Sequence, residues 1–501
     1  MKKRDPFTEP FCEAKDLGLA IPDDEHAVSV CLPRWRDVVG YEEQDSRVLD
    51  ELECGYPRFV EHPLVAELFY AAEEEFAKKN ETALVFPTLS AAWRCADFAR
   101  ANGAEKTRLE SYGWNDLTAL VVREKDYPIA WKGWQHMGEI VSSRLAEAAL
   151  RDAPLSDEQE QAGKEADRIL RERIAGLYGK CKADDVFLFS SGMAAIAAVH
   201  RVLMRKFPEL PTIQLEFPYL DALKLQQKCN PAGVVDFSIS ENGGLNNVAD
   251  YFSKGNRAAG LFTEVPSNPL LRTGNLREIS PILRENGVPL IIDDTVATAV
   301  NVDALQFADA VTTSLTKAFS GAGDVAAGSV VLNPESPHYE FLKTELATEE
   351  SASPLFCLDA IVLEINSRHF VERIEAINEN SVEIIDFLID HPQVEALWHP
   401  SIVQRDFYDD LRTPEGGYGG LFSIKLKGGE SEVISFYDKL KISKGPSLGT
   451  NFSLVCPYTI LAHYGELDWA ESCGVSRNLI RIWIGLEETE DLIARFQAAL
   501  E

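Results

Sequence analysis

The sequence predicts an α/β fold with a mostly parallel central sheet flanked by helices, and a smaller α+β domain at its C-terminal side. Between residues 185 and 335, short runs of Val, Ile, Leu and Phe show no polar alternation, which is typical of strands buried on both faces. Helical patterns separate these runs, which favours parallel strands joined by crossover helices. After residue 340, long helical patterns alternate with short strands. We therefore expect an N-terminal extension over 1–150, a ligand-binding domain over 151–340 and a small domain over 341–501.

The N-terminal extension has an irregular rhythm. Residues 62–79, "HPLVAELFYAAEEEFAKK", form a pattern that predicts an amphipathic helix. The polar run over 151–168 predicts a solvated linker that leads into a helix, because runs of charge usually mark exposed faces.

The central region alternates apolar runs with helical patterns in a regular order. Strands are predicted over 184–189, 211–217, 258–265, 288–294, 308–315 and 328–333, and helices over 192–207, 219–229 and 276–287. In the last region, residues 421–427 and 478–487 predict strands. Ligands of open parallel sheets bind beyond the carboxyl ends of the strands, so polar residues at those ends are candidates for a functional site.

Composition excludes several classes of partner. The chain has 501 residues, with 49 Lys and Arg against 80 Asp and Glu, and a net charge of -31, which repels nucleic acids and anionic membranes. No segment approaches 18 consecutive apolar residues, so we expect no membrane span. The nine cysteines form no C-x-x-C pair, which indicates reduced thiols in a cytoplasmic protein. No metal is expected.

Two of the predicted strand ends could bind a flat anionic ligand. Gly192 and Met193 open a helix directly after a strand, so their backbone N–H groups could bind a phosphate. Close packing of a turn of small residues would explain them equally well. Tyr219 follows the next strand and could stack on a planar ring, although an ordinary half-buried tyrosine is a serious alternative.

The other two strand ends carry a pair of carboxylates and a lysine. Asp293 and Asp294 close an apolar strand, and a buried carboxylate needs a partner, so one of them is expected to meet a cation. The alternative is a helix cap formed by Asp294 or Thr295. Lys317 follows the last of these strands, in a dry site where a lysine becomes a neutral nucleophile suited to forming a Schiff base. A solvent-facing lysine is disfavoured by the Gly- and Ala-rich residues 318–328.

Together these parts describe a pyridoxal phosphate site. Such a site combines a lysine that binds the cofactor covalently, a carboxylate on the ring nitrogen, an aromatic side chain over the ring and a helix N-terminus with hydroxyls for the phosphate. The hydroxyls are those of Ser314 and Thr316. The combination is far more specific than any one member.

Several motifs resemble the Cys/Met-metabolism family of pyridoxal phosphate enzymes. They are "EVPSNPLLRTGNL", "IIDDT", "SLTKAFSGAGDVAAGSVV", "GPSLGTNFSL" and "LIRIWIGLEETEDLI", and they follow the order of the family over about 135–501. The N-terminal segments "HAVSVCLPRW", "GYPRF" and "WQHMGEIVSSRLAE" resemble the longer cystathionine γ-synthases that are typical of fungi. The resemblance implies a type I, aspartate aminotransferase-like fold whose ligand-binding domain holds the cofactor.

The resemblance also implies roles for individual residues. Lys317 matches the lysine that binds the cofactor, and Asp293 matches the aspartate that pairs with the pyridinium nitrogen. Tyr219 matches the tyrosine that stacks on the ring. Lys317 and Tyr219 are the expected proton carriers. The residues that match phosphate-binding positions are Gly192, Met193, Ser314 and Thr316, and Asn268 matches the asparagine near the phenolic oxygen of the cofactor. Ser447 and Arg481 match positions that bind the substrate carboxylate, a group that the planar fork of an arginine fits well.

The sequence departs from the family pattern at three places. A Tyr-x-Arg motif that a neighbouring subunit supplies to the phosphate appears as "SSR", which keeps Arg144 without the tyrosine. A separate "YPR", Tyr56 to Arg58, is an alternative source. Pro446 stands where the synthases commonly have glutamate, and Asp294 replaces an asparagine.

The implied activity is γ-replacement on an O-acylated L-homoserine, with cysteine as the nucleophile and cystathionine as the product, as in transsulfuration and methionine biosynthesis. The alternatives are γ-substitution with another nucleophile such as sulfide or a carbanion, a C–S lyase, or a non-catalytic regulatory relative. The resemblance further implies a homodimer or homotetramer in which residues 1–150 contact a neighbouring subunit.

Overall fold

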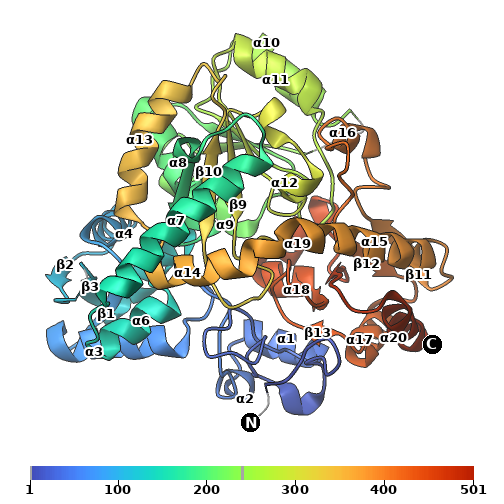
Figure 1. Cartoon of the computed structure of the whole chain (residues 1–501), viewed down its shortest axis with the longest axis horizontal. Helices are drawn as coiled ribbons and strands as arrows, with labels where there is room; N and C mark the ends of the chain where they lie inside the picture. The colour runs from blue at the N-terminus through green and yellow to red at the C-terminus, as the bar shows by residue number, and fades with distance from the viewer. Residues whose placement is uncertain (1–2, 115, 239–241) are drawn as a thin grey trace.

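The computed structural model describes residues 3–114, 116–238 and 242–501, which fold around three sheets (Figure 1). The central sheet has seven strands in the order β4-β10-β9-β8-β7-β5-β6. Its strands are β4 (Val186–Phe189), β5 (Thr212–Leu215), β6 (Val234–Phe237), β7 (Leu261–Glu264), β8 (Leu290–Asp293), β9 (Ala310–Ser314) and β10 (Gly328–Leu332).

The central sheet confirms the predicted mostly parallel arrangement. Strands β6, β5, β7, β8 and β9 run parallel, whereas β10 is antiparallel to both of its neighbours. The six strands predicted in this region are all present. Strand β6 was not predicted, because it lies at the edge of the sheet, where its residues are only partly buried and Asp236 interrupts the apolar run.

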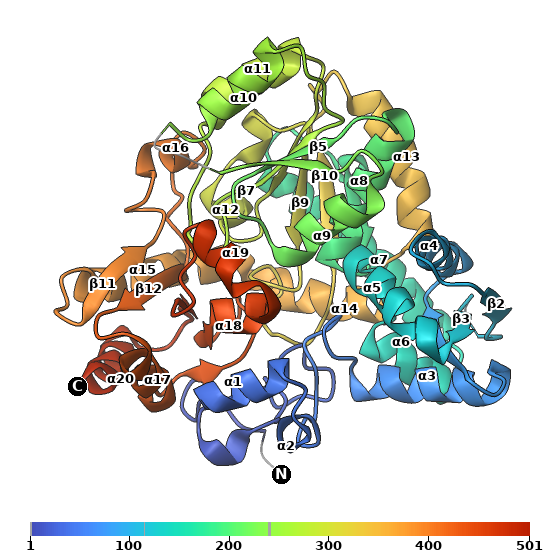
Figure 2. The same cartoon turned by 180° about the vertical axis from the view of Figure 1, so that it is seen from behind.

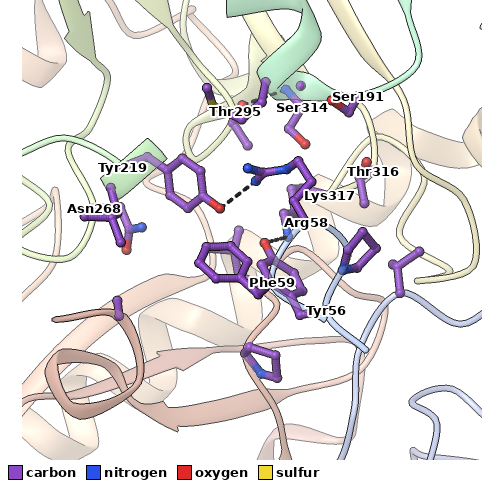
Figure 3. Close-up of a pocket in the computed structure, with 18 of the residues that line it drawn as sticks. Tyr56, Arg58, Phe59, Ser191, Tyr219, Asn268, Thr295, Ser314, Thr316 and Lys317 are labelled. Atoms are coloured by element: carbon purple, nitrogen blue, oxygen red, sulfur yellow. Dashed lines mark hydrogen bonds between the residues drawn. The ribbon is translucent and has the colours of Figure 1, made fainter. Parts of the chain in front are cut away.

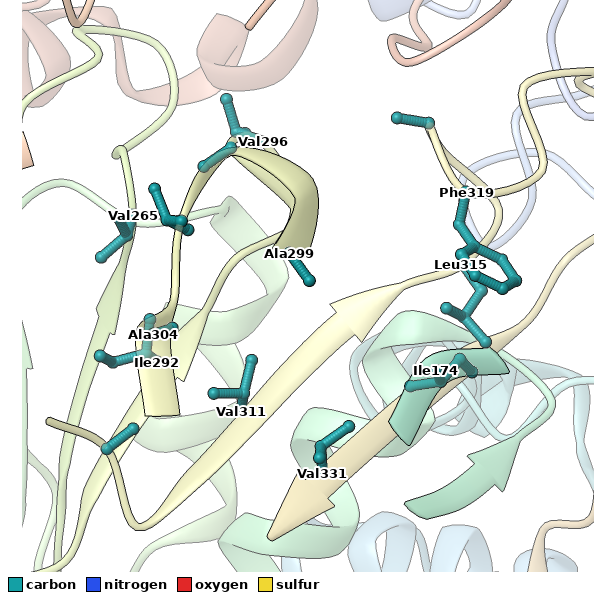
Figure 4. Packing of buried hydrophobic residues seen from close by; sticks show 14 of the residues in the cluster. Ile174, Val265, Ile292, Val296, Ala299, Ala304, Val311, Leu315, Phe319 and Val331 are labelled. Atoms are coloured by element: carbon teal, nitrogen blue, oxygen red, sulfur yellow. The ribbon is translucent and has the colours of Figure 1, made fainter. Parts of the chain in front are cut away.

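Each face of the central sheet packs into a different hydrophobic core, because successive side chains of a strand point to opposite faces. On one face, Ile292, Val311 and Val331 lie in one cluster with Ile174 (Figure 4). On the other face, Ile291 and Val330 pack with α8 (Gly192–Lys206), the helix that follows β4. Both faces are therefore buried, which explains why the strands lack polar alternation.

Helices cover both faces of the central sheet. The first core includes α7 (Asp157–Leu177), α11 (Leu276–Glu285), α12 (Thr298–Asn301) and α14 (Cys357–Asn366), and the second includes α8 (Gly192–Lys206), α9 (Leu220–Cys229) and α13 (Tyr339–Ala352). Helices α7 and α14 cross the front of the view in Figure 1, and α9 is seen from the opposite side in Figure 2. The polar run predicted as a linker becomes helical at Asp157, where the Ser156 side chain caps the first turn of α7.

The first 150 residues pack in two different places. The predicted amphipathic helix is α3 (Pro63–Phe76), and its apolar face joins the core of α8. It packs there with a three-stranded antiparallel sheet that was not predicted, and with three further helices. These elements are β1 (Glu81–Phe86), β2 (Thr107–Ser111), β3 (Thr118–Arg123), α4 (Leu89–Ala101), α5 (Tyr127–Met137) and α6 (Ser143–Leu150).

The segment before α3 packs instead on the C-terminal domain. Helix α1 (Trp35–Glu42) places Trp35, Val38 and Tyr41 in the core of the C-terminal sheet, and α2 (Ser46–Leu49) follows it. Figures 1 and 2 show both helices at the bottom of the molecule, where α1 contacts α17 and α18 of that domain. This arrangement brings residues 28–59 close to the C-terminal domain. Several of these residues line the candidate site described below.

The C-terminal domain is a five-stranded sheet packed against helices, as predicted. The strand order is β11-β12-β15-β14-β13. In the whole described part of the chain, no helix is long and apolar enough to cross a membrane. The elements are β11 (Val394–Trp398), β12 (Leu421–Leu426), β13 (Ser443–Lys444), β14 (Leu454–Pro457), β15 (Ile480–Trp483), α15 (Phe370–Ile389), α17 (Glu430–Lys439), α18 (Tyr458–His463), α19 (Leu467–Ser472) and α20 (Thr489–Leu500). Two other helices, α10 (Leu245–Ser253) and α16 (Arg405–Asp409), place Val248, Phe252 and Tyr408 in the first core of the central sheet.

Candidate active site

A cavity lies at the carboxyl ends of three neighbouring strands of the central sheet. Glu264, Asp293 and Ser314 are the last residues of β7, β8 and β9, and all three line it. The cavity encloses about 1330 Å³, counting its opening to solvent. Its walls come from the N-terminus of α8, the C-terminal domain and residues 56–59 of the N-terminal segment (Figure 3). Of the predicted site residues, the lining includes Gly192, Met193, Tyr219, Asn268, Asp293, Ser314, Thr316, Lys317 and Arg481.

Lys317 is the buried amine of this cavity. Its side chain is held by two hydroxyls: Nζ donates to Tyr56 Oη over 2.7 Å and to Ser447 Oγ over 2.9 Å, and the residue is only 9% exposed. Burial lowers the pKa of Lys317, and the positive charges of Arg481 and Arg58 act in the same direction. Among the described residues no carboxylate forms an ion pair with it. The amine is therefore biased toward its neutral, nucleophilic form.

Tyr56 and Arg58 both reach this cavity from the same chain as Lys317. Although burial opposes ionisation of Tyr56, Lys317 lowers the pKa of its hydroxyl. One Arg58 nitrogen donates to Tyr219 Oη over 2.7 Å and the other forms an ion pair with Asp221. Figure 3 shows Lys317 directed at Tyr56 and Tyr219 directed at Arg58. The sequence left Tyr56 and Arg58 as an open alternative, and the structure brings them into the cavity.

Arg144, by contrast, lies outside the cavity. Its guanidinium is buried at the start of α6, where it donates to the Asp324 carbonyl over 2.7 Å and to the Asp359 carboxylate over 3.2 Å. The structure therefore does not bring Arg144 together with the other predicted cofactor residues of its own chain. Its predicted reach to the phosphate of a neighbouring subunit stays a prediction.

The N-terminus of α8 offers free backbone donors to one end of the cavity. Helix α8 begins at Gly192, and the Ser191 side chain caps it by accepting from Ala194 N over 3.0 Å. The first N–H groups of a helix have no acceptor within it. A side chain at position 192 would place its Cβ only 2.6 Å from that of Ser314, so glycine permits the close approach of β9. The hydroxyl of Thr316 is already bonded to the backbone of Ala327, over 3.0 and 3.3 Å.

The two consecutive carboxylates divide between the cavity and the protein interior. Asp293 lines the cavity, and it accepts from Thr295 N over 2.9 Å and Thr312 Oγ1 over 3.4 Å. Asp294 faces the other way and is fully buried, accepting from Tyr178 Oη over 2.7 Å and Thr313 Oγ1 over 2.6 Å. Burial raises the pKa of Asp293, and it raises that of Asp294 to about 7. Within the described residues, neither carboxylate has a cationic partner.

Arg481 lines the opposite side of the cavity, with the C-terminal domain behind it. Its guanidinium donates to Pro446 O over 2.7 Å, Ser447 O over 3.3 Å and Asn268 Oδ1 over 3.3 Å, and it lies 5.0 Å from the centre of the Tyr458 ring. All these acceptors are neutral, and no described carboxylate lies within ion-pair distance. A structural ion pair with an acidic residue, which would be the alternative to a substrate-binding role for Arg481, is therefore absent from the described part of the chain.

Sequence reasoning missed several residues that line the cavity, among them Glu264 and Thr295. Glu264 is half-buried at the end of β7 beside Asp293, where it accepts from Tyr219 N over 2.5 Å and Asn268 N over 3.1 Å. Burial raises the pKa of Glu264 to about 8. Glu264 could have been predicted in the same way as Asp293, because each is a carboxylate at the end of a largely apolar strand. Thr295 also lines the cavity and holds Ser314 N over 2.8 Å.

The donor set fits pyridoxal phosphate. Arg58 and the free N–H groups of α8 suit a phosphate, and the amine of Lys317 suits covalent attachment. Asp293 is a buried carboxylate that faces the cavity without a cation, and a protonated ring nitrogen would supply one. The flat ring of Tyr219 stands at the same cavity, as stacking on a planar cofactor requires.

Substitution of Asp293 should affect the cofactor far more than the same change at Asp294. We expect Asp293→Asn to weaken cofactor binding by about tenfold to a hundredfold, because a hydrogen bond to a charged group is lost. Asp294→Asn is the matched control: it should lower the melting temperature and leave cofactor affinity nearly unchanged, because its partners are Tyr178 and Thr313. Titration of each apoenzyme with pyridoxal phosphate, followed by absorbance, measures the difference. A larger loss at Asp294 would show that the register of the motif is off by one.

Comparison with known proteins agrees with this geometry. Residues 160–501 match the family model described as Cys/Met metabolism PLP-dependent enzyme, and residues 64–142 match that of the fungal trans-sulfuration enzyme N-terminal domain. A cystathionine gamma-synthase of Neurospora crassa is 34% identical over 97% of this chain and 98% of its own. A cystathionine gamma-synthase-like enzyme of Amanita muscaria is 33% identical over 97% of this chain and 96% of its own.

A solved structure shows the same fold. The crystal structure of a cystathionine gamma synthase from Xanthomonas oryzae pv. oryzae, in complex with aminoacrylate and cysteine, superposes with a TM-score of 0.58 at 24% identity, covering 68% of this chain and 86% of that one. The predicted type I fold and the predicted cofactor, pyridoxal phosphate, are both confirmed. With a family model that spans most of its length and relatives that align over nearly all of it, this chain belongs to the Cys/Met-metabolism family of pyridoxal phosphate-dependent enzymes.

Proposed function

We propose that the protein catalyses γ-replacement on an O-acylated L-homoserine, with cysteine as the nucleophile and cystathionine as the product. The observation that carries the proposal is the position of Lys317, whose buried amine lies in one cavity with the hydroxyl of Tyr56 and with Arg481, a guanidinium that has no acidic partner among the described residues. These groups suit an amino-acid substrate whose carboxylate is bound and whose Cα and Cβ protons are moved. The names of the relatives support the same reaction class.

In the proposed mechanism, Lys317 would hold pyridoxal phosphate, which would supply an electron sink for the charge that develops at Cα. The amine of Lys317 would take the Cα proton, since its pKa is lowered by burial. Asp293 would favour the protonated form of the ring nitrogen. Tyr56 is within 2.7 Å of Lys317 Nζ, so it joins Tyr219 as a candidate for carrying protons during loss of the γ-acyloxy group and addition of the thiol.

The phosphate would be held by the N-terminus of α8 at Gly192 and Met193, together with Ser314, Thr316 and Arg58. Arg58 is preferred to Arg144 within one chain, because Arg58 lines the cavity, whereas Arg144 lies outside it beside Asp324 and Asp359. Tyr219 would stack on the ring, and Asn268 would lie near its phenolic oxygen. The predicted homodimer or homotetramer and the cytoplasmic location stay predictions.

The substrate carboxylate would be bound by Arg481 and Ser447. Arg481 is 6% exposed and already oriented by Pro446 and Asn268, so little side-chain entropy is lost on binding. Ser447 also accepts from Lys317, which links the carboxylate site to the reacting amine.

One experiment separates γ-replacement from its alternatives. The holoenzyme is incubated with O-acetyl-, O-succinyl- and O-phosphohomoserine, with and without cysteine, and the products are identified by mass. We expect cystathionine from at least one ester when cysteine is present. Ketoacid without thiol addition would instead favour a lyase, and products with sulfide or a carbanion alone would favour another nucleophile. The non-catalytic alternative is not supported, because the chain belongs to an enzyme family and retains Lys317.

A further inference from the structure

One wall of the active-site cavity is built by the N-terminal segment and α18. We call it the outer wall, because Glu42, Phe59, Leu461 and Ala462 are partly exposed, whereas Lys317 and Arg481 are buried. Tyr41 and Glu42, at the end of α1, line this wall with Phe59, Leu461 and Ala462. Helices α1 and α18 pack against each other there. Apart from Glu42 and the Tyr41 hydroxyl, the side chains of this wall are hydrocarbon. A carboxylate in such a wall requires an explanation.

Glu42 has no partner among the described residues. It is half-buried and lines the cavity, yet none of these residues forms a hydrogen bond or an ion pair with its carboxylate. Burial raises the pKa of Glu42 to about 8, and the charge of Lys132 opposes that effect only in part. The neighbouring Glu43 differs in each respect, because it is exposed, does not line the cavity and accepts from Tyr464 Oη over 2.6 Å. A cation that entered the cavity would compensate the cost of burying the Glu42 carboxylate.

The inner charges of the cavity already have uses in the proposed reaction. Arg481 faces the carboxylate of the first substrate, and Asp293 faces the ring nitrogen. Glu264 is occupied by two backbone N–H groups. An amino-acid thiol that attacks Cγ must approach from the outer side, because the inner end is filled by the cofactor and the first substrate. Its ammonium group then meets the outer wall, where Glu42 is the acidic residue of the lining.

We propose that Glu42 forms the subsite for the ammonium group of the amino-acid thiol that adds at Cγ. This inference rests on the proposed γ-replacement, and it identifies the class of nucleophile as a thiol with a cationic amine. A thiol without that amine would lose the contact with Glu42 and keep all others.

The test compares two thiols in three variants and the unchanged enzyme. L-cysteine and 3-mercaptopropionate differ in the α-ammonium group, and each is titrated against a fixed concentration of the homoserine ester that the enzyme uses. The variants are Glu42→Gln, Glu42→Asp and, as the matched control, Glu43→Gln. We expect Glu42→Gln to raise KM for L-cysteine about tenfold to a hundredfold, the range for a lost hydrogen bond to a charged group. KM for 3-mercaptopropionate should stay unchanged, Glu42→Asp should restore part of the affinity for cysteine, and Glu43→Gln should resemble the unchanged enzyme.

The outcomes distinguish this inference from the proposed function. If the unchanged enzyme joins cysteine to the ester and Glu42→Gln alters KM equally for both thiols or for neither, the ammonium subsite is wrong and γ-replacement stands. If the unchanged enzyme joins no thiol to any ester, the proposed function and the subsite both fall. Cofactor absorbance and melting temperature of each variant verify that it is folded.

Discussion

Replacing Lys317 by Ala is expected to abolish turnover and to leave the fold intact. Loss of a single general acid–base group costs about 10²–10⁴ in rate, and here the same amine also attaches the cofactor, so activity should fall below detection. The fold should survive, because the partners of Nζ among the described residues are the hydroxyls of Tyr56 and Ser447. Borohydride reduction followed by peptide mapping should place the cofactor on Lys317 in the unchanged enzyme, and Lys317→Ala should retain none.

Lys444 provides a matched control for this prediction. It is fully buried, and burial lowers its pKa to about 8, so it shares the electrostatic character of Lys317. It lies outside the cavity, however, and donates to the carbonyls of Pro33 and Asp438 over 2.9 and 3.1 Å. Lys444→Met should lower the melting temperature and keep a reducible cofactor. Turnover above a trace in Lys317→Ala, or a cofactor mapped to Lys444, would refute the assignment of Lys317.

Replacing Arg481 by Lys should raise KM strongly for every amino-acid substrate. A lysine presents a point charge where arginine presents a planar fork that matches a carboxylate. The loss of a charge-assisted hydrogen bond corresponds to about tenfold to a hundredfold in affinity. Cofactor binding should be nearly unchanged, because the described partners of Arg481 are Asn268, Pro446 and Ser447. Steady-state kinetics and cofactor titration measure the two effects separately.

Arg173→Lys serves as the structural comparison for Arg481. Arg173 on α7 forms an ion pair with Glu364 over 2.8 Å and bonds Ser367 over 2.6 Å, and it does not line the cavity. Its substitution should lower the melting temperature without changing KM. If Arg481→Lys behaves in this way, with normal kinetics and reduced stability, then Arg481 is a structural residue and the carboxylate site lies elsewhere.

Much of the central sheet could be predicted because its signal is local. Strands β4, β5, β7, β8, β9 and β10 are buried on both faces, so their apolar runs are continuous and easily found. Asp293 and Lys317 could be found for the same reason, since a charged residue directly after an apolar strand is conspicuous. Strands β2 and β6 were missed because they lie at sheet edges and are partly exposed, so their patterns are weaker. Strands β1 and β3 are mostly buried and were missed although their apolar runs are present in the sequence.

The sequence by itself determined the class of fold, which is confirmed, and it predicted Lys317 as the cofactor lysine and Asp293 as the carboxylate for the ring nitrogen, because each depends on residues adjacent to a strand. Only the tertiary structure decided that Tyr56 meets Lys317, 261 residues away, and that Arg58 meets Tyr219. It also placed Glu42 in the cavity wall and Arg144 beside Asp359. Contacts between distant segments depend on how α1 packs on the C-terminal domain and α6 on the central core, and no local periodicity or propensity encodes that packing.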